Sequence, residues 1–446
     1  MKISFSPDKF LLFAYFIILS ILGTFFLQLP AAYASGEAVP VIDALFTSVS
    51  ALCVTGLSTV DMNVYTVTGF SVILILIELG GLGILTFVSM VVAAPGKKVS
   101  LVNRKIAKDF FVDEVEANPR KILSNILTLT FCIQLLGACI LYPLFSMEHV
   151  ELPLFTAVFT SVSAFCNAGF FLFSDSLSQF THNKLLQLTV MVLIFSGGIG
   201  FIVLKNVYQM VRGRKKHLSL HSKLALLSSI FLIISGALVF FVSEYNHSYI
   251  DLTIAEKAAA SLFQSITART AGFETIAQSR QGPSSNIMTI LLMFIGGSPG
   301  SIAGGVKTTT FFIAVFYFIK GNEERSNLYL FHRTVNSTTI TKAVSIVVKS
   351  FLIVFISFFL LVISENQSLL VHRFSIADLL FETVSAFGTV GLSCGITSEL
   401  SFPGKIIIIL TMFIGRTGIF AMALGSRRSS IEKRFIRFPD ESVLIG

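Results

Sequence analysis

The sequence predicts an all-α integral membrane protein with eight transmembrane helices, arranged as four tandem repeats around one pseudo-fourfold axis. Composition is the first observation behind this fold class. Among 446 residues, 54% are hydrophobic and only 13% carry a charge, which is about half the charged fraction of a typical soluble protein. The second observation is a series of long apolar runs, and the third is a short motif that recurs four times between them.

The long apolar runs are candidate spans, because about 20 apolar residues cross a bilayer as a helix. Four further apolar runs are only 11 to 14 residues long, so they predict short helices that enter the membrane without crossing it. The long runs cover residues 10–30, 67–94, 122–146, 185–210, 224–243, 286–320, 343–364 and 404–425, and the short runs cover 41–54, 153–166, 258–268 and 376–388.

Each short run lies between two long ones, so the order span, short helix, span occurs four times. This order divides the chain into four predicted repeats, at residues 1–94, 95–211, 212–320 and 321–446. The last repeat includes a C-terminal tail, which the orientation described next makes cytosolic.

Basic residues predict the orientation, because Lys and Arg are enriched on the cytosolic side of membrane proteins. With the N-terminus in the cytosol, 25 of the 33 basic residues fall in cytosolic segments. The sequence therefore predicts a multi-pass protein of the cell membrane, with both termini cytoplasmic and the short helices entering from outside. The cytosolic segments are 1–9, 95–121, 205–223, 320–349 and 426–446.

A motif of hydroxyl, β-branched, hydroxyl and alanine residues recurs in the short runs, and a glycine follows the alanine four or five residues later. A second glycine marker begins 24 to 28 residues after that glycine. Two markers in matching register indicate an ancestral fourfold duplication. The motifs begin at Ser48, Ser161, Ser265 and Thr383, their glycines are Gly56, Gly169, Gly272 and Gly391, and the second markers begin at Gly80, Gly197, Gly296 and Gly415.

Four short helices that each end in a glycine-containing turn would aim four backbone segments at one axis. Irregular backbone at membrane depth survives only where it lines a cavity or is buried in protein. Glycine lets the chain adopt positive φ, so that carbonyl groups can turn inward. Rings of carbonyl oxygens replace the hydration shell of a monovalent cation, and helix C-terminal ends favour positive charge. The pattern indicates a cation-conducting pore.

With these features the chain resembles the Trk/Ktr/HKT superfamily of potassium uptake proteins over essentially its whole length, and it most resembles the Ktr-type membrane subunit. The most specific motifs are Thr-Ala-Arg-Thr-Ala-Gly-Phe at 267–273, Gly-Gly-Ser-Pro-Gly-Ser-Ile-Ala-Gly-Gly-Val-Lys-Thr at 296–308, and Gly-Arg-Thr-Gly at 415–418. The resemblance implies span–pore-helix–span repeats around a single pseudo-fourfold pore.

The resemblance also implies a potassium selectivity filter with one turn from each repeat. All four central positions hold glycine, which by analogy with plant members implies a preference for potassium over sodium; sodium stimulation is left open. The implied filter residues are Val54, Thr55, Gly56 and Leu57; Asn167, Ala168, Gly169 and Phe170; Thr270, Ala271, Gly272 and Phe273; and Thr389, Val390, Gly391 and Leu392.

The run at 286–320 is longer than one span requires, and the Gly, Ser and Pro residues at its centre predict a broken helix. In the resembling family this loop obstructs the pore and must move for conduction. Arg416 is predicted near mid-membrane, and the resemblance implies an electrostatic barrier beside the loop. An arginine held by loop carbonyls for structure alone is the alternative. The implied gate residues are Gly296, Gly297, Ser298, Pro299, Gly300, Ser301, Ala303, Gly304, Gly305, Lys307 and Arg416.

Two further charged residues near the predicted pore have structural interpretations. Arg269 precedes the third filter turn, and we expect it to tie that turn to an acidic residue, with Glu274 and Glu382 as the candidates. Glu78 lies inside the second span, where we expect a structural partner rather than an ion ligand.

The sequence predicts neither an enzyme nor an organic cofactor, because it contains no Walker A motif and no His/Asp metal-binding motif. Potassium is the expected transported ion. The main alternative is a secondary carrier for another cation or a small solute, with its site between broken helices. Such carriers tend to show a matched pair of broken spans, whereas only 286–320 looks broken here. A membrane enzyme or scaffold offers no account of four filter-like turns.

Expected partners follow from the resemblance, which implies a membrane homodimer docked on a cytosolic ring of nucleotide-binding RCK domains. The basic segments 95–121 and 205–223 are candidates either to face that ring or to contact anionic membrane lipid. No nucleic-acid partner is expected.

Overall fold

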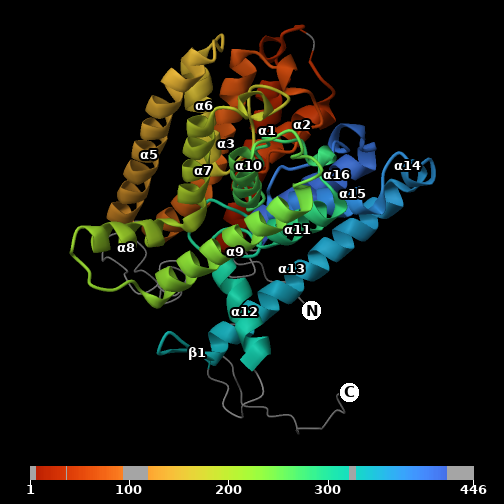
Figure 1. The fold of residues 1–446 in the computed structure, drawn as a ribbon. Coiled ribbons are helices and arrows are strands. Elements are labelled where there is room, and N and C mark those ends of the chain that lie inside the picture. The colour runs from red at the N-terminus through yellow and green to blue at the C-terminus, as the bar shows by residue number, and fades with distance from the viewer. Residues whose placement is uncertain (1–6, 37, 94–118, 321–327, 419–446) are drawn as a thin grey trace, which may run out of the picture.

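The computed structural model describes residues 7–36, 38–93, 119–320 and 328–418. These residues form a helical bundle with one small two-stranded hairpin (Figure 1). Side-chain statements below concern this part of the chain. The predicted tail and most of the basic segment 95–121 lie outside it.

The first half of the chain follows the predicted order of long and short helices. Its short helices begin at or just after a proline, which fits the first turn of a helix because it has no N–H to leave unpaired. The helices are α1 (Pro7–Leu27), α2 (Val41–Leu52), α3 (Val67–Ala93), α5 (Pro119–Met147), α6 (Pro153–Cys166), α7 (Lys184–Ile199) and α8 (Phe201–Val211).

The second half repeats the order, with added short elements. The short helices α10 and α15 each begin with a capping box, in which Thr253 and Ser375 pair with Glu256 and Asp378. The helices are α9 (Leu220–Glu244), α10 (Ile254–Thr267), α11 (Pro283–Phe294), α12 (Thr308–Lys320), α13 (Ser337–Ser364), α14 (Asn366–Leu370), α15 (Ile376–Gly388) and α16 (Phe402–Phe413), followed by a π-helical turn (Ile414–Gly418).

Smaller elements connect these helices. Strands β1 (Leu328–Leu330) and β2 (Arg333–Val335) pair antiparallel within the predicted cytosolic segment 320–349, and the sequence analysis did not foresee them. Short 3₁₀ turns lie at Pro30–Ala32, Met62–Val64, Ser178–Phe180, Gln278–Arg280 and Thr397–Glu399.

Three of the described helices are long and apolar enough to cross a membrane alone, namely α5, α9 and α13. The pair α7 and α8 qualifies only as one bent span, with an angle of 106° at the break. A continuous span at 185–210 was therefore a wrong prediction. The chain bends at Gly200, whose φ of +93° suits a residue without a side chain.

The short helices α2, α6, α10 and α15 form the centre of the molecule, and most of their residues are buried. The long helices expose large apolar side chains on the outside; on α13, Phe351, Phe355 and Phe359 are 56 to 63% exposed. Exposed apolar surface on this scale marks a contact with lipid or protein. The polar hydroxyls of the motif are thus inside, and the apolar surface is outside.

Candidate functional site

The four short helices end in equivalent turns. In each turn, a residue in the left-handed conformation stands two positions before the predicted filter glycine, which itself has positive φ. The left-handed residues are Val54, Asn167, Thr270 and Thr389, with φ of 57°, 57°, 73° and 50°, and the glycines are Gly56, Gly169, Gly272 and Gly391, with φ of 98°, 71°, 76° and 95°.

The four turns meet in a closed ring. A Cβ atom added to Gly56 would lie 2.5 Å from the carbonyl oxygen of Ala168, and one added to Gly169 would lie 3.0 Å from that of Ala271. A Cβ on Gly272 would overlap the carbonyl oxygen of Val390, and one on Gly391 would overlap that of Thr55. Each glycine thus faces the carbonyl that precedes the next glycine in chain order, and the fourth turn closes on the first.

The second hydroxyl of each motif holds the turn that follows it. Ser163 Oγ donates a hydrogen bond to the Phe170 carbonyl and Thr267 Oγ1 donates to the Phe273 carbonyl, each at 2.7 Å. In the other two turns, Ser50 Oγ accepts from the Gly56 N–H and Ser385 Oγ accepts from the Gly391 N–H. The bulky residues after the glycines, Leu57, Phe170, Phe273 and Leu392, are all at most 1% exposed and pack behind the turns.

The first hydroxyl of the motif anchors three of the short helices to the preceding long helix. Ser48, Ser161 and Ser265 donate to carbonyls of α1, α5 and α9, at 2.9, 2.6 and 2.8 Å. A glycine lies opposite each serine, at Gly23, Gly137 and Gly236, where a Cβ would overlap the serine or lie 2.5 Å from it. Sequence reasoning missed these three glycines, although each precedes its serine by 24 to 29 positions.

Residues 295–307 form a non-helical loop between α11 and α12, which we call the central loop. The Gly296 N–H donates to the Val306 carbonyl at 2.9 Å, and the Thr308 N–H donates to the Gly297 carbonyl at 3.0 Å. Gly300 and Gly305 have positive φ. The Gly, Ser and Pro residues of this segment therefore interrupt the helix where the sequence predicted a break.

The central loop is attached to the end of α7. The Ser298 N–H donates to the Gly198 carbonyl at 2.9 Å, the Ile302 N–H to the Gly197 carbonyl at 3.3 Å, and the Phe201 N–H to the Gly300 carbonyl at 3.1 Å. Two of these bonds use the Gly198 and Gly197 carbonyls, and the third uses the Phe201 N–H. A continuous helix would pair these groups internally, which is the physical reason for the break at Gly200.

The other side of the loop lies against the fourth glycine turn. A Cβ on Gly304 would overlap the Thr389 hydroxyl, and it would lie 2.9 Å from the Gly388 carbonyl oxygen. The Lys307 ammonium folds back to donate to the Ala303 carbonyl within the loop. The predicted gate residues between 296 and 307 thus lie in one connected segment, which contacts the fourth turn at Gly304.

Arg416 joins the central loop to the first repeat. Its guanidinium donates to the Ile302 carbonyl of the loop and, at 2.8 Å, to the Gly80 carbonyl of α3. The side chain is 5% exposed, and no acidic side chain pairs with it among the described residues. An arginine held by carbonyls keeps its positive charge unneutralised, so the structural and electrostatic interpretations of Arg416 are compatible.

Comparison with known proteins identifies the family. The family model described as TrkH, cation transport protein, matches residues 3–433. The chain belongs to the TrkH family. It is 36% identical to the Ktr system potassium uptake protein B of Bacillus subtilis, with 100% of this chain and 98% of that protein covered.

Two further comparisons agree with membership of the TrkH family. The chain is 35% identical to the potassium/sodium uptake protein NtpJ of Enterococcus hirae, with 98% of this chain and 96% of that protein covered. Its fold is similar to the crystal structure of the potassium transporter TrkH from Vibrio parahaemolyticus, with a TM-score of 0.75, 16% identity, and coverage of 98% of this chain and 87% of that chain.

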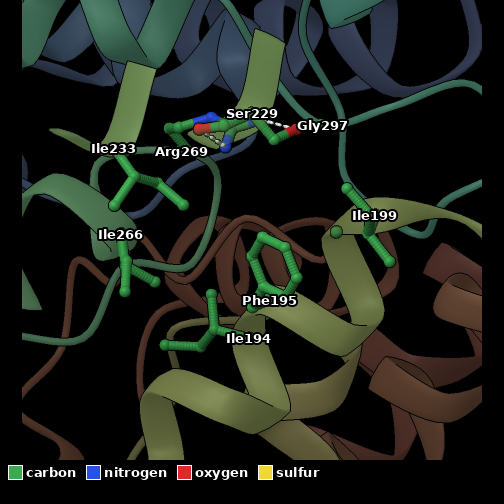
Figure 2. A pocket seen from close by; sticks show the side chains of 9 residues that line it. Ile194, Phe195, Ile199, Ser229, Ile233, Ile266, Arg269 and Gly297 are labelled. Carbon is green, nitrogen blue, oxygen red and sulfur yellow. Dashed lines mark hydrogen bonds between the residues drawn. The ribbon is translucent and has the colours of Figure 1, made fainter. Parts of the chain in front are cut away.

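Within the part of the chain that the structure describes, Arg269 of this TrkH-family chain has no acidic partner, contrary to our prediction. Its guanidinium donates to the Ser229 carbonyl at 3.4 Å, the Ser229 hydroxyl at 3.2 Å and the Gly296 carbonyl at 3.4 Å. Figure 2 shows it at one wall of a small crevice that is otherwise lined mainly by isoleucines and Phe195. Arg269 therefore ties the third filter turn to α9 and the central loop, not to a carboxylate.

The two acidic candidates have other partners. Glu382 accepts hydrogen bonds from Ser393 Oγ at 2.8 Å and Thr397 Oγ1 at 2.6 Å. The backbone of Glu274 bonds to the second repeat, since its N–H donates to Ser176 Oγ and its carbonyl accepts from the Leu177 N–H. Both residues stabilise connections that follow the filter turns.

Glu78 on α3 has polar neighbours from the second repeat. Its Oε2 accepts from Gln134 Nε2 at 3.0 Å and from the Cys166 thiol at 3.5 Å, while Oε1 is buried without a partner. Cys166 directly precedes the second filter turn, so Glu78 links α3 to that turn, as expected of a structural partner.

Carboxylates at the ends of α5, α9 and α13 bond to residues at the start of α7, α11 and α16, respectively. Glu148 accepts from Asn183 at 3.0 Å, Glu244 accepts from the Gly282 N–H at 2.8 Å, and Glu365 accepts from the Ser401 hydroxyl at 2.6 Å. An ion pair between Lys405 on α16 and Asp43 on α2, at 2.6 Å, joins the last repeat to the first. Among the described residues, no group of three or more His, Cys, Asp or Glu side chains could hold a metal ion.

Proposed function

We propose that this TrkH-family chain takes up potassium across the cell membrane, through a filter built from its four glycine turns. The closed ring of turns carries the proposal, because it brings four sets of backbone carbonyls together. Such carbonyls can replace the hydration shell of a monovalent cation. The names of relatives add support, since the Bacillus subtilis and Enterococcus hirae proteins are called potassium and potassium/sodium uptake proteins.

The proposed architecture is eight spans in four span–pore-helix–span repeats, with the boundaries 1–94, 95–211, 212–320 and 321–446. Two of the spans are broken, α7 with α8 and α11 with α12. Both termini are proposed to be cytoplasmic, so that α2, α6, α10 and α15 enter from outside. Their C-terminal ends then point at the ion, where the helix dipole favours a cation.

The proposed filter residues are the sixteen from 54–57, 167–170, 270–273 and 389–392. Their side chains are mostly buried behind the turns, which leaves backbone oxygens for ion binding. We also propose to measure whether sodium stimulates potassium uptake, because the name of the Enterococcus hirae relative includes both potassium and sodium.

The central loop and Arg416 are proposed as the gate. The loop contacts the end of α7, the fourth filter turn and, through Arg416, α3, so it crosses between three repeats near the filter. A passing cation would meet both the loop and an unneutralised guanidinium. Conduction then requires the loop to move away from Thr389.

The proposed assembly is a membrane homodimer, regulated by a cytosolic ring of RCK domains that binds nucleotide. The resemblance to Ktr-type subunits supports this proposal. Pull-down of the full chain followed by mass measurement tests it: a dimer mass and a nucleotide-binding partner are expected, and a monomer without such a partner contradicts it.

The uptake proposal is tested in a cell that lacks its own potassium uptake. Expression of the chain should restore growth at low potassium and produce rubidium uptake that potassium inhibits more strongly than sodium does. Adding sodium during potassium uptake measures the stimulation. Failure to restore growth, with the protein present in the membrane, would contradict the proposal.

A secondary carrier remains the second candidate, and one observation favours it. The structure breaks two spans, whereas the sequence indicated only one, and a pair of broken helices is typical of carriers. An exchange measurement separates the carrier from the gated filter. Unlabelled substrate on the opposite side of the membrane accelerates uptake of labelled substrate by a carrier. A filter with a movable gate shows no such acceleration.

A further inference from the structure

Helix α8 couples a surface of the molecule directly to the central loop. It leaves α7 at Gly200 with a bend of 106° and runs away from the bundle centre (Figure 1). The first residue of α8, Phe201, donates its N–H to the Gly300 carbonyl of the loop at 3.1 Å. A Cβ on Gly200 would lie 2.7 Å from the Pro299 carbonyl oxygen. Displacing α8 therefore displaces the loop or breaks these contacts.

The far end of α8 exposes apolar and basic side chains together. Tyr208 is 51% exposed, Met210 39% and Val211 79%. Arg212, Arg214 and Lys216 follow and are exposed as well, and the Arg212 guanidinium lies 4.7 Å from the centre of the Tyr208 ring. No acidic residue occurs between 201 and 223. A short helix with apolar, aromatic and basic residues is typical of a helix that lies in the interface of an anionic bilayer.

The basic end of α8 is held in place by the segment that follows it. Asn206 on α8 donates to Ser222 Oγ at 2.9 Å and accepts from Lys215 Nζ at 3.3 Å. The segment that carries Arg212, Arg214 and Lys216 is therefore folded back against α8. Charge on a fixed helix end can transmit force to the other end, whereas charge on a free tail cannot.

We propose that anionic phospholipid headgroups bind Arg212, Arg214 and Lys216 and thereby hold the central loop against the filter. The proposal rests on the proposed function and on the cytoplasmic location of residues 205–223. Charge complementarity favours headgroups, and the exposed Tyr208, Met210 and Val211 fit the acyl boundary below them. Because lipid binds the arrangement in which α8 contacts the loop, it shifts the population toward that arrangement and lowers flux.

The experiment measures rubidium flux with the full chain in vesicles of phosphatidylcholine alone, and in vesicles with about 30% phosphatidylglycerol. We expect flux about 3- to 10-fold lower with phosphatidylglycerol, and partial recovery at higher ionic strength. The triple variant Arg212→Gln, Arg214→Gln, Lys216→Gln should remove most of this difference.

A matched control removes the same charge elsewhere. Arg333→Gln, Lys342→Gln and Lys349→Gln replace three exposed basic residues on β2 and α13, and this variant should keep the wild-type lipid response. Equal flux in both vesicle types, higher flux with phosphatidylglycerol, or an unchanged response in the α8 variant overturns the proposal. If the α8 variant keeps the lipid response but loses a copurifying cytosolic protein, the surface binds protein instead.

Hydrogen exchange separates this proposal from the proposed function. Amides of residues 201–211 should exchange more slowly in vesicles with phosphatidylglycerol, and the α8 variant should lose that protection. Protection without rubidium flux would contradict potassium uptake but support lipid binding by α8. Rubidium flux without lipid-dependent protection would support potassium uptake but contradict lipid binding by α8.

Discussion

At the scale of single residues, the four glycine turns of the proposed filter hold some residues in a backbone conformation that they rarely adopt. Val54, Thr270 and Thr389 are β-branched and have positive φ, which is a genuine outlier for such residues. The cost is of order 1–3 kcal/mol for each. The surrounding structure compensates, because the buried hydroxyls of the motif bond the backbone of each turn. Strain retained at three of the four equivalent positions supports a functional role for the turns.

The filter glycines can be tested with a control at the same φ. Gly391 and Gly395 both have φ of +95°, but a Cβ on Gly391 would overlap the Thr55 carbonyl oxygen, whereas nothing lies within 4 Å of a Cβ on Gly395. Both alanine variants bear a strain of about 1–2 kcal/mol. Only Gly391→Ala should lower rubidium uptake, by about tenfold or more, because it displaces a filter carbonyl. Equal uptake by the two variants would argue against a filter at this position.

Arg416 can be tested by separating its charge from its hydrogen bonds. Arg416→Ala removes both, and uptake should become several-fold faster as the loop is released. Arg416→Lys keeps the charge but not the planar fork that reaches two carbonyls. If the bonds to Ile302 and Gly80 hold the loop, the lysine variant should resemble the alanine variant.

Kinetics of ion uptake at several potassium concentrations provide the measurement. A lysine variant with wild-type kinetics would assign the effect of Arg416 to charge alone. Unchanged kinetics in the alanine variant, with normal insertion, would exclude both roles.

At the scale of elements, the sequence predicted the order of helices but missed one break. The run at 185–210 contains Gly197, Gly198 and Gly200 but no proline. A similar glycine marker at 80–83 lies inside the continuous helix α3, so these glycines alone do not predict a break between α7 and α8. The bend at Gly200 depends on hydrogen bonds with Ser298, Gly300 and Ile302, about a hundred residues away. The break at 295–307 was predictable because Gly, Ser and Pro residues mark it locally.

The partner of Arg269 was unpredictable for a related reason. Its partners are the Ser229 and Gly296 carbonyls and the Ser229 hydroxyl. Every residue carries a carbonyl, so sequence cannot indicate which one a buried arginine will bind. The positive φ of Gly56, Gly169, Gly272 and Gly391 was predictable, because this backbone conformation favours one residue type.

The carboxylate at the end of α9 should stabilise the start of α11. Glu244 is fully buried and accepts from the Gly282 N–H, Ser248 Oγ and the Ser285 hydroxyl. Glu244→Gln replaces one acceptor oxygen with a donor, which should cost about 1–3 kcal/mol. Thermal unfolding in detergent measures the change.

Glu256 offers the comparison for Glu244. It completes the capping box of α10, and its side chain is 21% exposed, so Glu256→Gln should lower the unfolding midpoint much less than Glu244→Gln does. An equal shift in the two unfolding midpoints would contradict the special role of the Glu244 carboxylate.

At the scale of the whole molecule, the N-terminal and C-terminal parts of the chain must join for the ring of turns to close. Besides the contact between Gly391 and Thr55, the ion pair of Asp43 and Lys405 forms this junction, and both side chains are at most 14% exposed. Either single change, Asp43→Asn or Lys405→Gln, leaves a poorly solvated charge behind. The double variant leaves no unpaired charge. Its unfolding free energy should therefore be higher than the sum of the two single losses predicts.

A double-mutant cycle measures this coupling as differences in unfolding free energy. We expect a coupling energy of about 1–3 kcal/mol, as for residues in direct contact. Additive losses would show that the pair does not hold the junction together.

The junction also has a consequence for synthesis of the protein. Asp43 and Lys405 are 362 residues apart in the chain, and ribosomes add roughly 5–20 residues each second. At that rate roughly 20–70 s pass between the synthesis of α2 and the synthesis of α16. During this interval the nascent protein lacks the contact between α2 and α16, and the Asp43 carboxylate has not yet met Lys405. A ribosome that stalls late therefore leaves a chain with nearly all its helices but no finished ion pathway.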